Sequence, residues 1–168
     1  KNKLRITKSL DIINHYTFAK DYCEKKILLS KKNKNLKYTI FRIFNVYGGG
    51  INNKYYISNI IKQFKKNKKK IKIKYYNNVR DYIHINDLSI LLYKSIIKRK
   101  VGIFEVASGK NISIKNLIIK IKKNYFINKN ILFVNPKESK KNNYSKSYIK
   151  KTIKTFGWKP KISINTGL

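Results

Sequence analysis

Tyr16 and Lys20 are the two residues of this chain whose types and spacing most directly suggest chemistry. Residues four apart on a helix lie on one face, so a phenol and an ammonium group would meet there. A free phenol has a pKa of about 10, and a nearby cation lowers it by stabilising the phenolate. The pair therefore predicts a tyrosine that exchanges protons with a substrate. The alternative is a solvated helical face, because a chain with 13 tyrosines and 41 lysines and arginines contains this spacing by chance.

The 168 residues carry a formal net charge of +34, which raises the alternative of a protein that binds nucleic acid or another anionic surface. Lysine, isoleucine and asparagine supply 87 of these residues, and all three have codons rich in A and T. Arginine, which grips phosphate with two hydrogen bonds and reads guanine, occurs only four times. Codon bias explains the charge better than selection for nucleic acid does, so we expect no nucleic-acid partner.

Cys23 is the only cysteine, which excludes an internal disulfide framework and favours a reducing, cytoplasmic setting. His15 and His84 stand 69 positions apart without a neighbouring cysteine, so their spacing predicts no metal site. No run of about 18 apolar residues occurs, and we expect no membrane partner. The sequence starts with Lys1 in the middle of a pattern, and we expect it to be a fragment.

The elements that would position these residues alternate between helix and strand, which predicts an α/β architecture. Asn14 is the expected N-cap of the helix that carries Tyr16 and Lys20, and Ser113 is the expected N-cap of a later helix. Helices are expected at residues 15–30, 57–64, from 86 or 87 onward, 114–121 and 149–156. Strands are expected at residues 38–44, 71–76, 79–85, 102–107 and 131–134.

Four segments, in this order, resemble the extended short-chain dehydrogenase/reductase family, and within it the nucleotide-sugar epimerases and dehydratases. They are residues 15–20 (HYTFAK), 41–48 (FRIFNVYG), 80–88 (RDYIHINDL) and 156–160 (FGWKP). The third segment is most similar to that of UDP-glucose 4-epimerases. The resemblance covers only the C-terminal half of the family pattern. The Gly-x-x-Gly-x-x-Gly turn that holds the dinucleotide pyrophosphate in this family does not occur in the 168 residues.

The resemblance implies the C-terminal part of a Rossmann-type parallel sheet domain joined to a smaller α/β substrate-binding domain. The Rossmann part would comprise residues 1–48, which end the dinucleotide-binding domain, and residues 76–100. Residues 49–75 would be an insertion that belongs to the substrate domain, and residues 101–168 would complete that domain.

By the same resemblance, the expected activity is that of an NAD-dependent nucleotide-sugar 4-epimerase, which moves a hydride from the sugar to NAD and returns it to the opposite face. Tyr16 would be the catalytic acid/base, and Lys20 would bind the nicotinamide ribose while lowering the pKa of Tyr16. Ile43 and Phe44 would pass near the nicotinamide, mostly through their backbone. A 4,6-dehydratase or a keto-sugar reductase of the same family is the alternative.

Two further residues are assigned to the nucleotide-diphosphate sugar by resemblance. Asn45 would contact the diphosphate with its amide, and Arg80 would grip it with its guanidinium group. The alternative for Asn45 is a turn asparagine that binds its own backbone. The alternative for Arg80 is an ion pair with Asp81 or Asp87. The family often dimerises through the helix with the tyrosine and lysine, so a homodimer is expected.

Other residues are expected to serve the structure. Asp87 is expected to cap a helix, and Asp81 to hold a neighbouring loop. His84 is expected to be a hydrogen-bonded core histidine, and Cys23 a small core residue on the helix that starts at residue 15. The three glycines at residues 48–50 depart from the family pattern, which leaves the identity of the sugar open.

Overall fold

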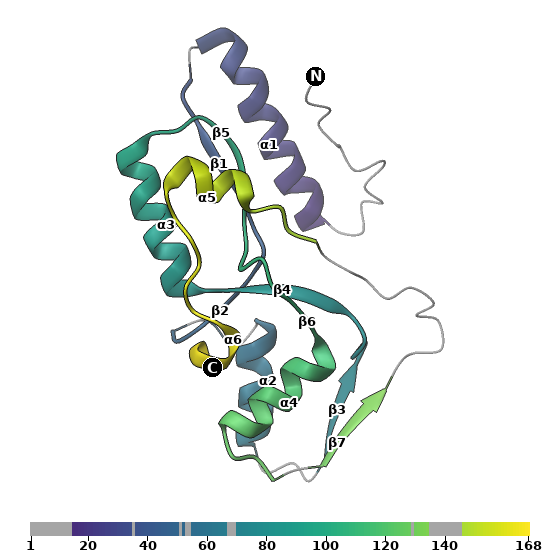
Figure 1. The fold of residues 1–168 in the computed structure, drawn as a ribbon. Helices are drawn as coiled ribbons and strands as arrows, with labels where there is room; N and C mark the ends of the chain where they lie inside the picture. Colours follow the sequence, from purple (N-terminus) through teal and green to yellow (C-terminus); the bar gives the residue numbers. More distant parts are fainter. Residues whose placement is uncertain are drawn as a thin grey trace.

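The computed structural model of the protein describes residues 15–34, 36–50, 52, 55–66, 70–128, 130–134 and 146–168. Asn14, the expected helix cap, lies outside these residues. In the described part, helices and strands alternate along the chain, which confirms the predicted α/β class (Figure 1). Across the same residues, no helix is both long enough and apolar enough to cross a membrane.

Every predicted helix and strand is present close to its expected bounds. The described helices are α1 (His15–Lys34), α2 (Tyr56–Lys65), α3 (Ile85–Lys98), α4 (Ile114–Asn124), α5 (Lys150–Phe156) and α6 (Ile164–Gly167). The described strands are β1 (Thr39–Ile43), β2 (Asn45–Tyr47), β3 (Lys70–Lys74), β4 (Val79–His84), β5 (Gly102–Val106), β6 (Asn111–Ser113) and β7 (Asn130–Val134).

β1 and β5 form a parallel pair in which Thr39 lies opposite Gly102 and Ile43 opposite Val106. The Phe44 N–H donates to the Val106 carbonyl at 2.9 Å and carries the ladder one residue past β1. α1 lies on one side of the pair, and α3 and α5 lie on the other (Figure 1). An apolar core joins this pair to β4, α3, α5 and the segment after α5: it consists of Ile83, Leu88, Leu91, Phe104, Val106, Phe156 and Trp158.

A second sheet has the strand order β2–β4–β6, with β2 parallel and β6 antiparallel to β4. β3 and β7 form a third, parallel pair. The alternating pattern of β3 buries Ile71 and Ile73 against α2 and α4, as its period of two predicts. The core there consists of Tyr47, Ile57, Ile60, Phe64, Ile71, Ile73, Tyr82, Ile114, Leu117, Ile118 and Ile121. Two separate cores agree with a two-part organisation, while the four domain boundaries stay a prediction.

The start of α3 differs from the prediction, because the N-cap is His84 and not Asn86 or Asp87. The His84 Nδ1 atom accepts the Asn86 N–H at 3.2 Å, which satisfies one of the N–H groups that a helix leaves open at its first turn. His84 is therefore a hydrogen-bonded, buried histidine, as predicted. Asp87 is buried instead of capping, and the prediction of its capping role was wrong.

The environment of Cys23 also differs from the prediction, because its side chain is exposed and not part of a core. α1 turns Glu24 toward β1, and consecutive residues of a helix point about 100° apart. The stripe that includes Cys23 and Tyr22 therefore faces away from the sheet of its own chain, and Tyr22 is 51% exposed. The helical period predicted this stripe correctly, but the period alone does not say what the stripe faces.

Candidate active site

The first turns of α1 bring Tyr16 and Lys20 together, as their spacing predicts. The Lys20 Nζ atom lies 5.6 Å from the centre of the Tyr16 ring, within the range of a cation–π contact. The Tyr16 side chain is 71% exposed, so its hydroxyl is open to a ligand on this face of the helix. The structure thus confirms that the two side chains meet and that the phenol is accessible, while the catalytic role stays a prediction.

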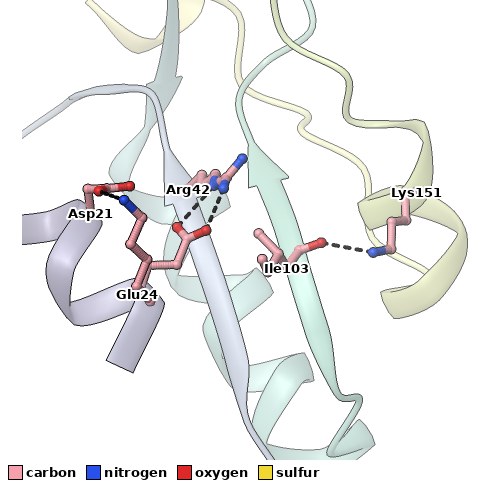
Figure 2. Close-up of polar contacts among 6 residues, drawn as sticks. Asp21, Glu24, Arg42, Ile103 and Lys151 are labelled. Carbon is pink, nitrogen blue, oxygen red and sulfur yellow. Dashed lines mark hydrogen bonds and ion pairs between the residues drawn. The ribbon is translucent and has the colours of Figure 1, made fainter. Parts of the chain in front are cut away.

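Glu24 and Arg42 fix the position of that helix relative to the sheet. The Glu24 carboxylate accepts a hydrogen bond from Arg42 Nε at 3.1 Å and also pairs with the Arg42 Nη2 atom (Figure 2). α1 runs antiparallel to β1 (Figure 1). Lys20 and Tyr16 precede Glu24 by about 6 and 12 Å along the axis, at 1.5 Å per residue. They therefore lie beyond the carboxyl end of β1, the edge at which open parallel sheets bind ligands.

Ile43 and Phe44 stand at that carboxyl end. The Ile43 side chain is 44% exposed and offers an apolar surface there. The Phe44 N–H is occupied by the Val106 carbonyl, so a backbone contact of Phe44 with a ligand would use its carbonyl oxygen. The predicted strand at residues 38–44 is β1, and a second short strand, β2, which was not predicted, follows it because the chain leaves the β1–β5 pair after Phe44 and joins β4 from Asn45 onward.

Asn45 and Arg80 occupy neighbouring strands of the second sheet. Asn45 is paired with Tyr82, and Arg80 lies two residues before Tyr82, about 7 Å along β4. The Asn45 Nδ2 atom donates to the Asp81 carbonyl at 2.9 Å, which fixes the orientation of the amide. An amide NH₂ has two donor hydrogens, so this bond leaves the group able to donate to a ligand as well. Asn45 is therefore a strand residue bound across the sheet and not the turn asparagine of the alternative.

The Arg80 guanidinium is anchored to its own strand. Its Nη1 atom donates to the Val79 carbonyl at 3.0 Å. The backbone passes from β1 into β2 between Phe44 and Asn45. This short crossing links the β1–β5 pair, against which α1 holds Tyr16 and Lys20, to the second sheet. Asn45 and Arg80 lie there on the adjacent strands β2 and β4.

Tyr82 is a buried neighbour of Asn45 and Arg80 that the sequence interpretation did not single out. It lies two residues after Arg80 on β4, is 5% exposed, and is the register partner of Asn45. Burial raises the pKa of Tyr82, with a smaller contribution in the same direction from Tyr56, while the Arg80 charge opposes the shift. The phenol therefore stays protonated. The period of two along β4 could have identified it, because residues two apart share one face of a strand.

Asp81 holds a loop beside the site, as predicted. Its Oδ1 atom accepts hydrogen bonds from the Ser108 N–H (2.8 Å) and hydroxyl (2.7 Å), and its Oδ2 atom accepts from the Gly109 N–H (2.8 Å) and the Ser147 hydroxyl (2.8 Å). The carboxylate is fully buried. These four bonds fix the end of β5 and the segment before α5 against the strand that carries Arg80.

Asp87 performs the same task for the last segment of the chain. Its Oδ2 atom accepts the N–H groups of Lys161 (3.0 Å) and Ile162 (2.8 Å), and its carbonyl accepts the Trp158 Nε1–H at 2.9 Å. Trp158 therefore packs this segment onto the body. Among the described residues, no group of three or more His, Cys, Asp or Glu side chains could hold a metal ion.

The sequence matches a family model described as "NAD dependent epimerase/dehydratase family" over residues 3–107, which is more than half of the chain. The chain belongs to this family. Over 86 residues, it is 33% identical to a GDP-6-deoxy-D-talose 4-dehydrogenase of Aggregatibacter actinomycetemcomitans, an alignment that covers 51% of this chain and 29% of that protein.

Solved structures show the same epimerase/dehydratase fold. A protein named RMD from Pseudomonas aeruginosa, complexed with NADPH, has a TM-score of 0.80 at 16% identity and covers 99% of this chain. A UDP-glucose 4-epimerase of Thermotoga maritima, with UDP-glucose, has a TM-score of 0.79 at 21% identity and covers 90% of this chain. The chain spans 59% and 50% of these two proteins, so it corresponds to about half of each.

The residues present fit one part of a dinucleotide such as NAD. The Tyr16 hydroxyl and the Lys20 ammonium are hydrogen-bond donors on the open face of α1, and ribose hydroxyls are suitable partners for both. The exposed Ile43 side chain offers an apolar surface for the nicotinamide ring. A pyrophosphate needs a glycine-rich turn at a helix N-terminus, and the 168 residues contain none with the spacing of this family. The fit is therefore to the nicotinamide and its ribose.

Proposed function

We propose that this chain supplies the acid/base pair and the diphosphate contacts of an NAD-dependent 4-epimerase that acts on a nucleotide-diphosphate sugar. The observation that carries the proposal is the contact of Lys20 with the Tyr16 ring beyond the carboxyl end of β1. The names of two relatives both place the reaction at position 4 of the sugar, because one is a 4-dehydrogenase of a GDP-sugar and the other a UDP-glucose 4-epimerase. The activity belongs to an enzyme that also contains a dinucleotide-binding half.

In this proposal, the Tyr16 oxygen takes the proton of the sugar hydroxyl as the carbon beneath it loses a hydride. NAD, when bound, would supply the hydride acceptor and donor for this reaction. Lys20, which lies against the Tyr16 ring, donates a hydrogen bond to a ribose hydroxyl. Tyr16 then gives the proton back when the keto-sugar presents its other face. One proton and one hydride leave and return, so the reaction has no net redox change.

Asn45 and Arg80 hold the substrate while its sugar turns over. The guanidinium group can bind two phosphate oxygens at once, and the Asn45 amide donates to a third. Tyr82, which burial keeps protonated, pairs with Asn45 across the sheet and lies two residues from Arg80 on β4. A fixed diphosphate with a mobile sugar is what an epimerase needs, because both faces of the same carbon must reach Tyr16.

A keto-sugar reductase is the second candidate, because the GDP-6-deoxy-D-talose 4-dehydrogenase is 33% identical over 86 residues. The two reactions differ in their redox balance. An epimerase interconverts two sugars without changing the amount of NADH, whereas a reductase consumes one NADH or NADPH for each keto-sugar. Following absorbance at the nicotinamide wavelength during product formation separates them.

The test of the chemistry is Tyr16→Phe in a polypeptide that joins residues 1–168 to a dinucleotide-binding half. Loss of the general acid/base should lower kcat by about 10² to 10⁴, with the Kd of the nucleotide sugar unchanged. Tyr22→Phe, on the same helix and also exposed, is the matched control and should leave kcat unchanged. Equal turnover in Tyr16→Phe and wild type would remove Tyr16 from the mechanism.

The test of the substrate contacts needs no turnover. Arg80→Lys removes the bidentate grip and should weaken UDP-glucose binding by about tenfold or more. Arg99→Lys makes the same exchange on an exposed residue at the end of α3 and should have no effect.

The 168-residue chain by itself should bind NAD weakly, because it lacks the pyrophosphate turn, and tight stoichiometric binding would contradict this expectation.

A homodimer through α1 is part of the proposal. Phe18, Tyr22 and Leu29 are 51%, 51% and 59% exposed and lie on the face of α1 turned away from β1. The rings of Phe18 and Tyr22 stack at 6.2 Å, which makes a flat apolar surface. Apolar surface of this kind suits a two-fold contact between copies. Sedimentation should show a dimer that Tyr22→Lys dissociates.

A reducing, cytoplasmic setting stays our prediction, and it is based on Cys23 being the only cysteine of the sequence.

A further inference from the structure

The helix α3 exposes a broad apolar surface that the described part of the chain leaves uncovered. Leu88 and Leu91 lie in the core. The Lys94 Nζ atom donates to the Gly157 carbonyl at 3.1 Å, so the Lys94 side of the helix faces the end of α5. At about 100° per residue, the opposite side of α3 turns away from α5. We refer to the residues on that side, all of them exposed, as the α3 face: Asn86, Ser89, Ile90, Leu92, Tyr93, Ile96 and Ile97.

The composition of the α3 face is unusual for this chain. Lysine and arginine supply 41 of the 168 residues, but neither occurs on the α3 face. Isoleucine, leucine and tyrosine occupy five of its seven positions. The side chains of Ile96 and Ile97 are 72% and 61% exposed. A contiguous apolar surface on a chain so rich in lysine indicates a contact with another polypeptide segment.

The strand β1 has an open edge. The Tyr38 carbonyl and the Phe44 N–H both bond to β5. The polar groups of successive strand residues point to alternate edges, so Phe41 and Ile43 direct theirs to the edge opposite β5. No described strand pairs with that edge. Parallel strands occur in sheets whose two faces are covered, so this edge suits a further parallel strand.

One partner can contact both features. α5 donates hydrogen bonds from Lys151 and Thr152 to carbonyls of β5. The α3 face turns away from α5, and the open edge of β1 is the edge away from β5. The chain spans only 59% and 50% of two solved structures with the same fold. In such a fold, strands alternate with helices that cover the sheet, so a strand added beside β1 brings a helix with it.

We propose that the α3 face and the open edge of β1 form the docking surface for the dinucleotide-binding half of the enzyme. That half adds a parallel strand along Phe41 and Ile43 and packs an apolar helix on Ile96 and Ile97. The proposal rests on the proposed function, which requires such a half. Its tests measure stability and hydrogen exchange and need no turnover, so the two proposals can fail separately.

The first test introduces Ile96→Lys together with Ile97→Lys into the 168-residue chain and into the polypeptide that joins it to a dinucleotide-binding half. In the chain alone the thermal midpoint should stay unchanged, because both positions are exposed. In the joined polypeptide the midpoint should fall by about 5 °C or more, because two charges would be buried at an apolar contact. The matched control is Phe126→Lys with Leu132→Lys, at positions 94% and 53% exposed outside the α3 face, which should be neutral in both.

The second test uses the wild-type sequence and depends on no variant. The Phe41 and Ile43 amides should exchange their hydrogens at least about 100-fold more slowly in the joined polypeptide than in the chain alone, because a new strand would bind them. The Arg42 amide is the internal control. It faces β5 in both proteins and should change less.

Three results would overturn the proposal. One is a loss in the joined polypeptide that is no larger for the α3 pair than for the control pair. Another is unchanged exchange at Phe41 and Ile43 after joining. The third is concentration-dependent protection of these amides in the 168-residue chain alone, which would assign the surface to a second copy. A joined polypeptide that protects them but has no turnover would support the docking surface and contradict the proposed function.

Discussion

Glu24 on α1 and Arg42 on β1 form a two-point ion pair, with Arg42 Nε donating to Glu24 Oε2 at 3.1 Å. Hydrogen bonding to Glu24 raises the pKa of Arg42 above its usual value, against the opposing effect of desolvation. This pair attaches α1 to the outer side of β1, while Lys151 donates to the Ile103 carbonyl from α5 on the opposite side (Figure 2). The contact therefore sets the position of Tyr16 and Lys20 relative to the sheet.

Glu24→Gln should loosen α1 from β1. The Arg42 side chain is 48% exposed and that of Glu24 20%, so solvent screens the pair and the expected loss of unfolding free energy is only about 1 kcal/mol. Amide hydrogen exchange in α1 should accelerate more than in α3. Asp21→Asn, which removes the exposed pair with Lys25 on the same helix, should cost no more than about 0.5 kcal/mol. Equal exchange rates in the two variants would contradict the tether.

The alternation of β-branched and helix-forming segments allowed the fold class, the helices and the principal strands to be predicted from the sequence. The residue that caps each helix was harder to predict. At the start of α3, His84, Asn86 and Asp87 all have side chains able to cap, and the choice of His84 follows from tertiary structure. The Asp87 carboxylate does not cap the helix, because it accepts the N–H groups of Lys161 and Ile162, which lie 74 and 75 residues later in the chain.

The features of the site that the sequence could not predict also depend on long-range contacts. The spacing of Tyr16 and Lys20 is local, so the helix alone brings them together. The placement of Asn45 beside Tyr82 depends on the pairing of β2 with β4, and no local pattern specifies that partner. The exposure of Cys23 has the same origin, since the period of a helix defines a stripe but not its neighbour.

Asp81→Asn should destabilise the protein strongly. Asp81 is fully buried and accepts four hydrogen bonds, two of them from the N–H groups of Ser108 and Gly109. An asparagine NH₂ would direct a donor at one of these donors, and the expected loss of unfolding free energy is about 2 to 4 kcal/mol. Chemical denaturation measures it.

The matched comparison for Asp81→Asn is Ser147→Ala, which removes one of the four bonds and leaves the carboxylate in place. Its expected cost is about 1 kcal/mol. If Asp81→Asn were as mild as Ser147→Ala, the carboxylate would not be the anchor of the loop at Ser108.

Tyr47 should make stability fall in alkaline solution. Its side chain is 1% exposed and its hydroxyl donates to the Ser163 carbonyl at 2.9 Å. Burial, with a smaller contribution from the Asp87 charge, raises the pKa of Tyr47 to about 12. The unfolded state has a pKa of about 10, so between these two values it loses its proton before the folded state does. The free energy of unfolding therefore falls as pH rises from about 10 to about 12, by roughly 2 to 3 kcal/mol at most.

Tyr47→Phe isolates this contribution from the lysines, which titrate in the same range in both proteins. At pH 7 the variant should be less stable by about 1 kcal/mol, because the Ser163 carbonyl loses its donor. Between pH 9 and 12 the stability difference between wild type and variant should shrink or reverse, since phenylalanine has no proton to lose. Tyr93→Phe, at a position that is 66% exposed, should follow wild type at every pH. A constant difference between wild type and Tyr47→Phe across this range would mean that the buried phenol does not set the alkaline limit of stability.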